Sequence, residues 1–202
     1  MKNIESIVNH LTQIDPQIIL IGCSSGGLDA LEKVLEKLPK AFPLPIVICQ
    51  HLAPDAGEYL VKYFDKHTNL PIFEAKSDQN IAAGYIYFAP GGYHLLIEEN
   101  RSFSLDVSER VSYCRPSIDV LFDSAITVYK AHILAIILSG ANEDGAMGAT
   151  HIIKHKGIVI VQDPATAQNS VMPQAVIAHE AYNYILSPVE MNIVLKRWSD
   201  GK

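Results

Sequence analysis

The feature that most constrains the fold of this chain is a repeated alternation of short, continuous apolar runs with segments of helical periodicity. The runs at 18–21, 45–50 and 132–138 are bounded by glycine, proline or polar residues. Unbroken runs of branched apolar residues are typical of parallel strands that helices cover on both faces. The alternation therefore predicts a doubly wound α/β domain, with a mostly parallel sheet between two layers of helices, a Rossmann-like three-layer arrangement.

A different pattern occupies the middle of the chain. Three short apolar runs, at 85–89, 94–98 and 103–107, follow one another closely and are separated by glycine-rich or polar turns. Such spacing is typical of antiparallel strands joined by tight turns. We therefore expect an antiparallel hairpin at one edge of the sheet.

Length and charge narrow the class of protein. The 202 residues fit a single domain (1–202), with a core at about 17–191 and an N-terminal helix at 3–13. The longest apolar runs fall well short of the roughly 20 residues that a membrane span needs, and the first residues lack the apolar block of a signal peptide. The formal net charge of −6 disfavours binding to nucleic acid or to a membrane surface. These features predict a cytoplasmic chain with no nucleic-acid partner and no membrane insertion.

The cysteines suggest neither a disulfide framework nor a zinc site. There are three of them, Cys23, Cys49 and Cys114, and no C-x-x-C pair. Two of the three lie in or beside apolar runs, which favours buried thiols. The histidines also lack the spacings that are typical of metal-binding helices. We therefore expect no metal and no cofactor.

Reactive groups in an open parallel sheet collect where the strands end. The first predicted strand is followed by GCSSGG at 22–27, which contains the pattern G-x-S-x-G ahead of a predicted helix. Glycines on both sides of a serine permit a sharp turn that exposes its hydroxyl, and N–H groups at the helix start can hold an oxyanion. Ser24 is therefore a candidate nucleophile. The alternative is a turn that binds a phosphate or only caps a helix.

A serine hydroxyl needs a base to accept its proton, and histidine is the usual base near neutral pH. His51 is the histidine that directly follows a buried strand expected beside the first one. The carboxylate that would orient this imidazole is either Asp144 or Asp163, because both follow later strands. Their positions alone do not separate the two.

Several separated blocks of this sequence resemble the catalytic domain of the chemotaxis protein-glutamate methylesterases of the CheB type. The blocks are IGCSSGG at 21–27, QH at 50–51, AGYIYFAPGGYHLLI at 83–97, RPSIDVLFDSA at 115–125, LSGANEDGAMG at 138–148 and VQDPATAQNSVMPQAVIAH at 161–179. They occur in the family's order and cover nearly the whole chain, which makes the resemblance more specific than any single motif.

The resemblance implies a role for each candidate. Ser24 would be the nucleophile, His51 the general base and Asp144 the orienting carboxylate, while Ser25 and Ala141 would contribute to the oxyanion or substrate site. The implied reaction removes methyl esters from glutamate side chains in the cytoplasmic helical region of methyl-accepting chemoreceptors and releases methanol. Deamidation of receptor glutamines is an implied second activity, and no cofactor is implied. A receptor methyltransferase, or a receiver protein acting in trans, is an implied further partner.

The sequence also departs from the family's pattern. Ser25 stands where threonine is common, and Ala141-Asn142 falls where the family has a G-M-G turn. The family's regulatory receiver domain is not in this sequence, so we expect control by another chain or constitutive activity. A catalytically degenerate signalling module and a general esterase are the alternative functions. The loops 53–58, 142–143 and 163–171 are either rims of the cleft or solvated connections.

Overall fold

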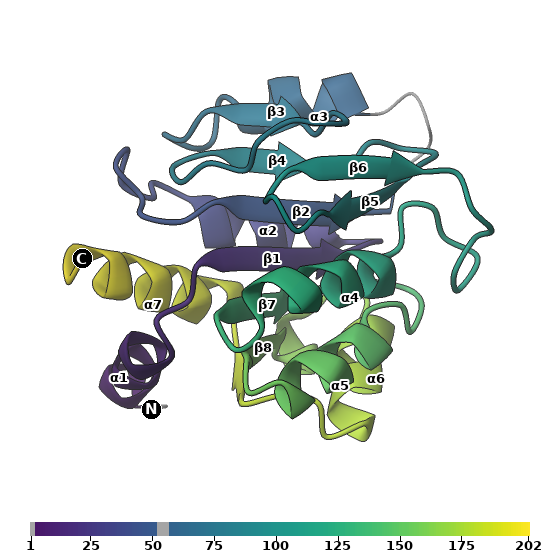
Figure 1. Cartoon of the computed structure of the whole chain (residues 1–202). Coiled ribbons are helices and arrows are strands. Elements are labelled where there is room, and N and C mark those ends of the chain that lie inside the picture. Colours follow the sequence, from purple (N-terminus) through teal and green to yellow (C-terminus); the bar gives the residue numbers. More distant parts are fainter. Residues whose placement is uncertain (1–2, 52–56) are drawn as a thin grey trace.

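A computed structural model describes residues 3–51 and 57–202 of the chain. Within these residues, seven strands form one parallel sheet in the order β3-β4-β2-β1-β7-β8-β9 (Figure 1). The strands are β1 (Ile18–Cys23), β2 (Ile46–Gln50), β3 (Ile72–Glu74), β4 (Ile86–Phe88), β7 (Ile133–Ile137), β8 (Ile158–Gln162) and β9 (Tyr184–Leu186). The predicted parallel sheet is confirmed.

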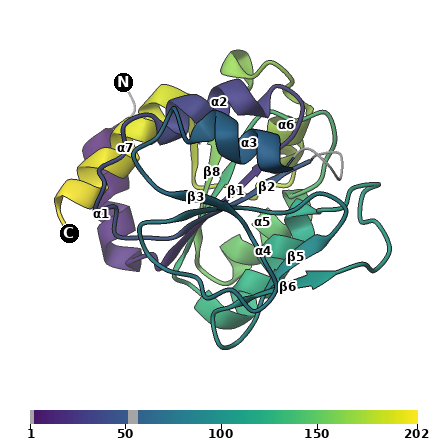
Figure 2. The ribbon, with the colours of Figure 1, turned by 90° about the horizontal axis from the view of Figure 1, so that it is seen from above.

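Helices cover both faces of this sheet, as the doubly wound prediction requires (Figure 2). One face carries α1 (Ile4–Ile14), α2 (Gly27–Leu35), α3 (Gly57–Phe64) and α7 (Pro188–Asp200). The other carries α4 (Ile118–Tyr129), α5 (Ala146–Lys154) and α6 (Val171–Ala178). Across the described ranges, no helix has the length and apolar character needed to cross a membrane.

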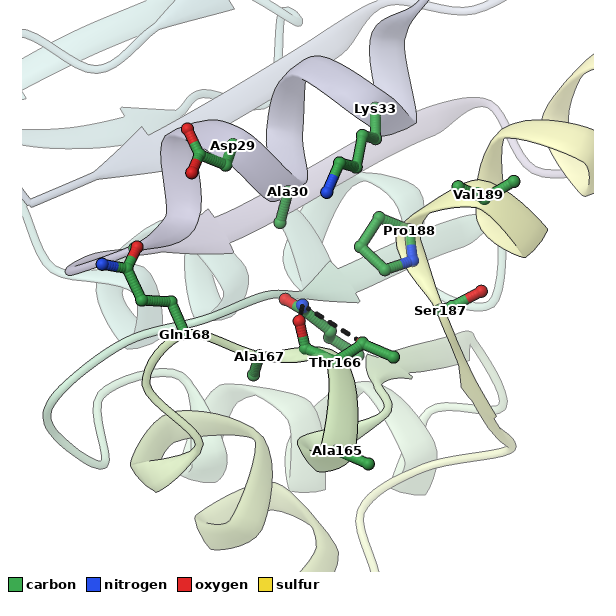
Figure 3. A pocket seen from close by; sticks show the side chains of 12 residues that line it. Asp29, Ala30, Lys33, Ala165, Thr166, Ala167, Gln168, Ser187, Pro188 and Val189 are labelled. Atoms are coloured by element: carbon green, nitrogen blue, oxygen red, sulfur yellow. Dashed lines mark hydrogen bonds between the residues drawn. The ribbon is translucent and has the colours of Figure 1, made fainter.

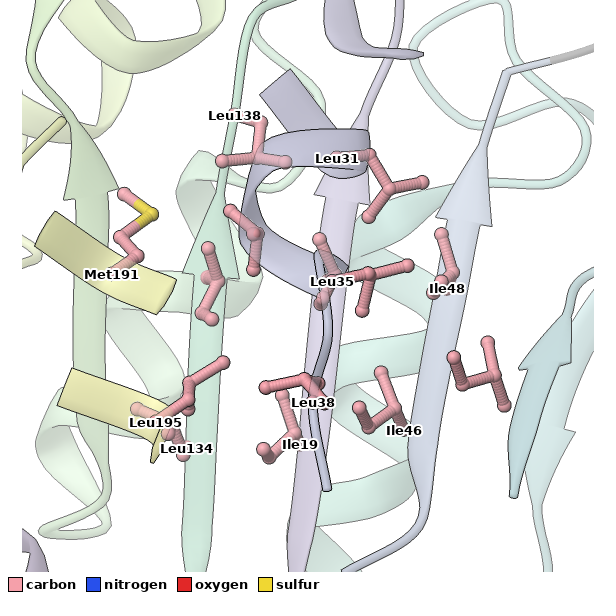
Figure 4. Close-up of a cluster of buried hydrophobic side chains, with 14 of the residues drawn as sticks. Ile19, Leu31, Leu35, Leu38, Ile46, Ile48, Leu134, Leu138, Met191 and Leu195 are labelled. Carbon is pink, nitrogen blue, oxygen red and sulfur yellow. The ribbon is translucent and has the colours of Figure 1, made fainter. Parts of the chain in front are cut away.

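The sheet separates two hydrophobic cores, and the central strand β1 contributes to both. Ile19 and Ile21 belong to the core under α2 and α7 (Figure 4), whereas Ile18 and Leu20 belong to the core under α4 and α5. All four side chains are fully buried. Because successive side chains of a strand point to opposite faces and both faces are covered, the strand is apolar at every position. This explains the unbroken runs in the sequence.

The middle of the chain follows the prediction in part. The strands β5 (His94–Ile97) and β6 (Phe103–Asp106) form the expected antiparallel hairpin, which is a sheet of its own whose β5 strand contacts α4. The run at 85–89 was expected to be antiparallel, and this was wrong. Its strand β4 lies inside the main sheet and is parallel to β2 and β3, with all three of its side chains buried. Three residues are too few for periodicity to distinguish the two arrangements.

The order of the strands decides where a site can form. The chain passes from β1 to β2 on one side and later returns to place β7 on the other side of β1. The carboxyl ends of these three strands therefore meet where the direction of winding reverses. Such a switch point is the usual position of the binding crevice in an open α/β sheet.

Gly22, in β1, is required by the packing of α4 on the sheet. A Cβ at this position would come within 2.6 Å of Ile118 Cγ2 and 3.0 Å of Ile137 Cδ1. Both neighbours are fully buried, so neither can move without disturbing the core. We expect Gly22→Ala to lower the free energy of unfolding by about 1–3 kcal/mol in urea titrations.

Gly201→Ala is the matched control, because a Cβ there would meet its nearest neighbour, Trp198 O, only at 3.6 Å. This substitution is expected to change the unfolding free energy by less than about 0.5 kcal/mol. Equal stability of the two variants would contradict the packing argument.

Candidate active site

Ser24 is the first residue after β1, and backbone hydrogen bonds fix its position. Its N–H donates to the carbonyl of Ser139, which follows β7, at 2.9 Å, and its own carbonyl accepts from Gly27 N–H at 2.9 Å. The turn needs Gly26, whose φ is +74° and whose added Cβ would lie 2.6 Å from Gln168 Cβ. The glycine-serine pattern therefore encodes the turn that the sequence predicted, with a partly exposed serine at its tip.

His51 lies beside Ser24 because β1 and β2 are parallel and in register. Cys23 pairs with Gln50 at the end of the two strands, and His51 N–H continues the ladder to the Cys23 carbonyl at 3.2 Å. His51 Nδ1 lies 3.2 Å from Ser24 Oγ. The other ring nitrogen, Nε2, lies 2.8 Å from Asp144 Oδ2. The structure thus brings together the serine, the imidazole and one of the two candidate carboxylates.

Asp144 is fully buried and is held by the start of α4. Its Oδ2 accepts from Ile118 N–H at 2.7 Å, and its Oδ1 accepts from Asp119 N–H at 3.1 Å and from the Ser117 hydroxyl at 2.9 Å. Burial acts to raise the pKa of Asp144, but the bonds from His51 and from the two N–H groups outweigh it and lower that pKa. The carboxylate is therefore ionised at the N-terminus of a helix, where negative charge is favoured.

Asp163, the other candidate carboxylate, is a helix cap and does not contact His51 in the described structure. Its side chain accepts a hydrogen bond from Ala165 N–H at 3.0 Å and so caps the short 3₁₀ helix Pro164–Thr166. Asp and Asn are common at helix starts for this reason. The structure thus places Asp144, and not Asp163, against the imidazole.

Cys114 is a neighbour of the imidazole that the sequence analysis did not identify. Its Sγ lies 3.4 Å from His51 Nδ1 and accepts a hydrogen bond from Asn142 Nδ2 at 3.0 Å. The residue directly precedes RPSIDVLFDSA, one of the blocks that carry the family resemblance, but is 63 positions from His51 along the chain. No local pattern signals such a contact.

The surroundings of His51 raise its pKa. Burial opposes protonation of the ring, but the hydrogen bond to Asp144 and the hydrogen bond and charge of Cys114 outweigh burial and raise the pKa from 6.5 to about 9. In the neutral ring, Nε2–H donates to Asp144 and Nδ1 carries the free lone pair. Two donors, the Ser24 hydroxyl and the Cys114 thiol, lie within reach of that lone pair.

Ser25 and Ala141 both offer backbone N–H groups. Within the described part of the chain, neither N–H has an acceptor. The fully buried Ser139 hydroxyl donates to the Ser25 carbonyl at 2.8 Å and so fixes the turn after Ser24. Ser25 shares a cavity with Ser24, whereas Ala141 is not among the described residues that line this cavity.

The side chains of Gln50 and Ser139 hold the backbone around Ser24 in place. The sequence analysis did not assign this role to either residue. Gln50 Nε2 donates to the carbonyls of Ser24 and His51 at 3.2 and 3.1 Å, and its Oε1 accepts from the buried Cys23 thiol at 2.9 Å. One amide thus ties the ends of β1 and β2 together. The backbones of Ser24 and His51 are therefore held in place by hydrogen bonds from a single side chain.

Two adjoining cavities form a groove over the site. The first, of about 470 Å³, is lined by Ser24, Ser25, Gly26, Leu28, Asp29, Gln50, His51 and Gln168. The second, of about 370 Å³, shares Gly26, Asp29 and Gln168 with it and runs between α2, the segment 165–168 and the start of α7 (Figure 3). The expected rim 163–171 thus contributes Gln168, and Asn142 of the rim 142–143 contacts Cys114. Residues 53–56 of the third expected rim lie outside the described residues.

The fold and this site define a class of protein. A serine hydroxyl, an imidazole and a buried carboxylate in series, at the carboxyl edge of a parallel sheet, are the arrangement of serine hydrolases. Residues 19–195 match the CheB methylesterase family. The chain belongs to the CheB methylesterase family, and the predicted resemblance is confirmed.

Named relatives agree with this assignment. A Leptospira interrogans protein, provisionally named protein-glutamate methylesterase/protein-glutamine glutaminase, is 42% identical over 85% of this chain and 89% of its own length. A Thermotoga maritima protein-glutamate methylesterase/protein-glutamine glutaminase is 34% identical over 89% of this chain, which spans 54% of that protein. The crystal structure of the Thermotoga maritima CheB methylesterase catalytic domain superposes with a TM-score of 0.87 at 33% identity, covering 90% of this chain and 98% of that one.

The raised pKa of His51 has a direct consequence for titration. We expect the His51 ring to titrate with a midpoint near 9 in NMR spectra of the folded protein, and Cys114→Ser to lower that midpoint. A raised pKa means that the folded state binds this proton more tightly. The resulting stabilisation is complete below pH 6.5 and is lost as the pH rises through about 9. A midpoint at or below 6.5 would show that burial affects the pKa of His51 more than Asp144 and Cys114 do.

Proposed function

We propose that this chain hydrolyses methyl esters of glutamate side chains on chemoreceptors, with Ser24 as nucleophile, His51 as general base and Asp144 as the orienting carboxylate. The observation that carries this proposal is the continuous series of contacts from Ser24 Oγ to His51 Nδ1 at 3.2 Å and from His51 Nε2 to Asp144 at 2.8 Å. Membership of the CheB methylesterase family supports the reaction and its substrate class.

The reaction follows from this geometry. Neutral His51 accepts the Ser24 proton at Nδ1 while Ser24 Oγ attacks the ester carbonyl. The N–H groups of Ser25 and Ala141, which have no acceptor within the described residues, are the donors we propose for the oxyanion. Protonated His51 then gives its proton to the leaving methoxide, and methanol departs. Water, activated by the same nitrogen, releases glutamate from Ser24.

Asp144 fixes the tautomer that this sequence of steps requires. By accepting from Nε2–H, it leaves the lone pair of His51 on the nitrogen that faces Ser24. It also stabilises the imidazolium that forms when the proton moves. A pKa near 9 makes His51 a strong base but leaves a smaller neutral fraction at neutral pH. With ammonia as the leaving group, the same steps would deamidate a glutamine.

The groove supports a protein substrate. A glutamate ester entering the Ser24 cavity would leave the rest of its polypeptide along the adjoining cavity beside α2. We infer that the substrate is the cytoplasmic helical region of a methyl-accepting receptor, and that the catalytic unit (about 17–191 within 1–202) acts in the cytoplasm. A receptor methyltransferase, or a receiver protein in trans, is the partner that we propose for its control.

The alternative functions fit the site less well. A degenerate module would not need the three reactive groups within hydrogen-bonding distance of one another, as they are here. A phosphate site would need positive charge, but the described lining of the Ser24 cavity holds Asp29 and neither lysine nor arginine. Comparing a methylated receptor fragment with a small aryl ester distinguishes a receptor esterase from a general esterase.

Loss of the Ser24 hydroxyl should abolish hydrolysis without unfolding the protein. We expect Ser24→Ala to lower kcat/KM by at least about 10³-fold, because the members of such a site act as a unit. Mass spectrometry of a methylated receptor fragment measures the loss of one methylene mass for each ester cleaved. Ser199→Ala, in α7, is the matched control and should retain full activity. Full activity of Ser24→Ala would exclude the proposed nucleophile.

The groove predicts that one substitution affects large and small substrates differently. Gln168 lines both cavities, so Gln168→Ala should raise KM for a methylated receptor fragment about 2–10-fold, the worth of one hydrogen bond. KM for a small aryl ester should change less than about twofold, since that ester does not extend along the groove. Gln174→Ala, on the exposed side of α6, is the control. Equal changes for both substrates would favour the general esterase.

A further inference from the structure

Cys114 and His51 form a second pair of reactive groups, which the proposed hydrolysis does not use. Cys114 Sγ lies 3.4 Å from His51 Nδ1, and Ser24 Oγ lies 3.2 Å from the same nitrogen. A thiol and a hydroxyl therefore both lie within 3.4 Å of one imidazole nitrogen at the carboxyl edge of the sheet. Cys114 and His51 are both partly exposed, so this point can be reached from solvent.

The separations match those of ligands around one zinc ion. Zinc binds sulfur at about 2.3 Å and imidazole nitrogen at about 2.0–2.1 Å in a tetrahedron, so the two ligand atoms lie about 3.6 Å apart. The Cys114–His51 distance is 3.4 Å. An oxygen and a nitrogen ligand of a tetrahedral zinc lie about 3.3 Å apart, and the Ser24–His51 distance is 3.2 Å. Both measured distances to His51 Nδ1 therefore lie within about 0.2 Å of those in a tetrahedral zinc site.

Asp144 supplies the outer contact that zinc-bound histidines need. A ligating imidazole usually donates its other N–H to a carboxylate, which fixes the tautomer. His51 Nε2 makes this contact with Asp144 at 2.8 Å. Although the ligand atoms of His51, Cys114 and Asp144 lie within 4.8 Å of one another, both Asp144 oxygens already accept hydrogen bonds from the start of α4. Asp144 therefore supports the site and does not ligate.

The backbone fixes Cys114 in a ligating position. Val111 and Cys114 exchange two backbone hydrogen bonds, of 3.2 and 2.8 Å, around a turn whose central residues Ser112 and Tyr113 have φ values of 50° and 64°. Two left-handed residues in succession define a tight turn of the I′ type. The Asn142 amide donates a hydrogen bond to Sγ at 3.0 Å, which further fixes the position of the sulfur.

We propose that His51 Nδ1 and Cys114 Sγ, with Ser24 Oγ as a third ligand, form an inhibitory site for Zn²⁺. Mixed nitrogen and sulfur donors favour zinc over magnesium or calcium. Binding releases the thiol proton and, where the ring is protonated, the Nδ1 proton to solvent, forms a Zn–S and a Zn–N bond, and transfers no electrons. The metal occupies the lone pair that would accept the Ser24 proton, so it blocks hydrolysis. Only this inhibitory consequence rests on the proposed function.

Co²⁺ is the probe for the site, because a Co²⁺–thiolate bond gives a sulfur-to-metal charge-transfer absorption. We expect this absorption when Co²⁺ is added to the reduced full-length protein, and we expect Zn²⁺ to displace it. Zn²⁺ should inhibit ester hydrolysis reversibly over the same concentration range, with activity restored by a chelator. Each rate is compared with the metal-free rate of the same variant.

Variants of two cysteines identify the ligand. Cys114→Ala and Cys114→Ser should lose the Co²⁺ absorption and should require at least about tenfold more Zn²⁺ for half-inhibition. The serine variant preserves the volume of the side chain in case the alanine variant does not fold. Cys49→Ala is the matched control, because Cys49 is fully buried in the core, and it should retain both responses.

Two results would overturn the site: no charge-transfer absorption in the unaltered protein, or Zn²⁺ inhibition that is unchanged in both Cys114 variants. The second would mean that zinc acts at surface groups such as His151 and Asp123, which lie 2.7 Å apart. The Co²⁺ absorption is also measured for the Ser24→Ala variant, in which His51 and Cys114 remain as ligands. Failure of the catalytic proposal therefore stays distinguishable from failure of the metal site.

Discussion

Asp144 carries its charge inside the protein, and the surrounding structure is arranged to compensate that charge. An unpaired buried carboxylate would cost several kcal/mol, so its partners are part of the fold as much as of the site. The partners are the first N–H groups of α4, the Ser117 hydroxyl and the His51 ring. α4 in turn packs on the central strand through Ile118 and Gly22. The position of the imidazole thus depends on how one helix lies on the sheet.

The lone pair of His51 Nδ1 links the two activities inferred for this site. Ser24 and Cys114 approach it from different segments, and only one partner can be well aligned with it at a time. The contacts that raise the basicity of the ring for proton transfer also prepare it as a ligand. Zinc binding and catalysis would therefore both depend on the hydrogen bond between His51 Nε2 and Asp144.

The sequence predicted most of the sheet and two of the three central side chains. Strands buried on both faces leave unbroken apolar runs, and Ser24 and His51 directly follow adjacent runs of this kind. The residues alone could not separate Asp144 from Asp163, because the choice depends on where α4 begins in space. The family resemblance favoured Asp144, and in the structure Asp144 is the carboxylate that contacts His51. Strand β4 was misplaced because its three residues carry too little pattern. Cys114 was missed because a turn and a distant amide position it.

The reactive groups come from the ends of β1, β2 and β7, so they are far apart along the chain although they touch in space. During synthesis, the histidine emerges 27 residues after the serine, whereas the acid follows 93 residues after the histidine. A nascent chain that has completed only its first two strands would hold a hydroxyl beside an unoriented imidazole. Esterase activity would then appear only once β7 and the start of α4 have joined β1 and β2, so hydrolysis would report that the middle of the sheet has formed.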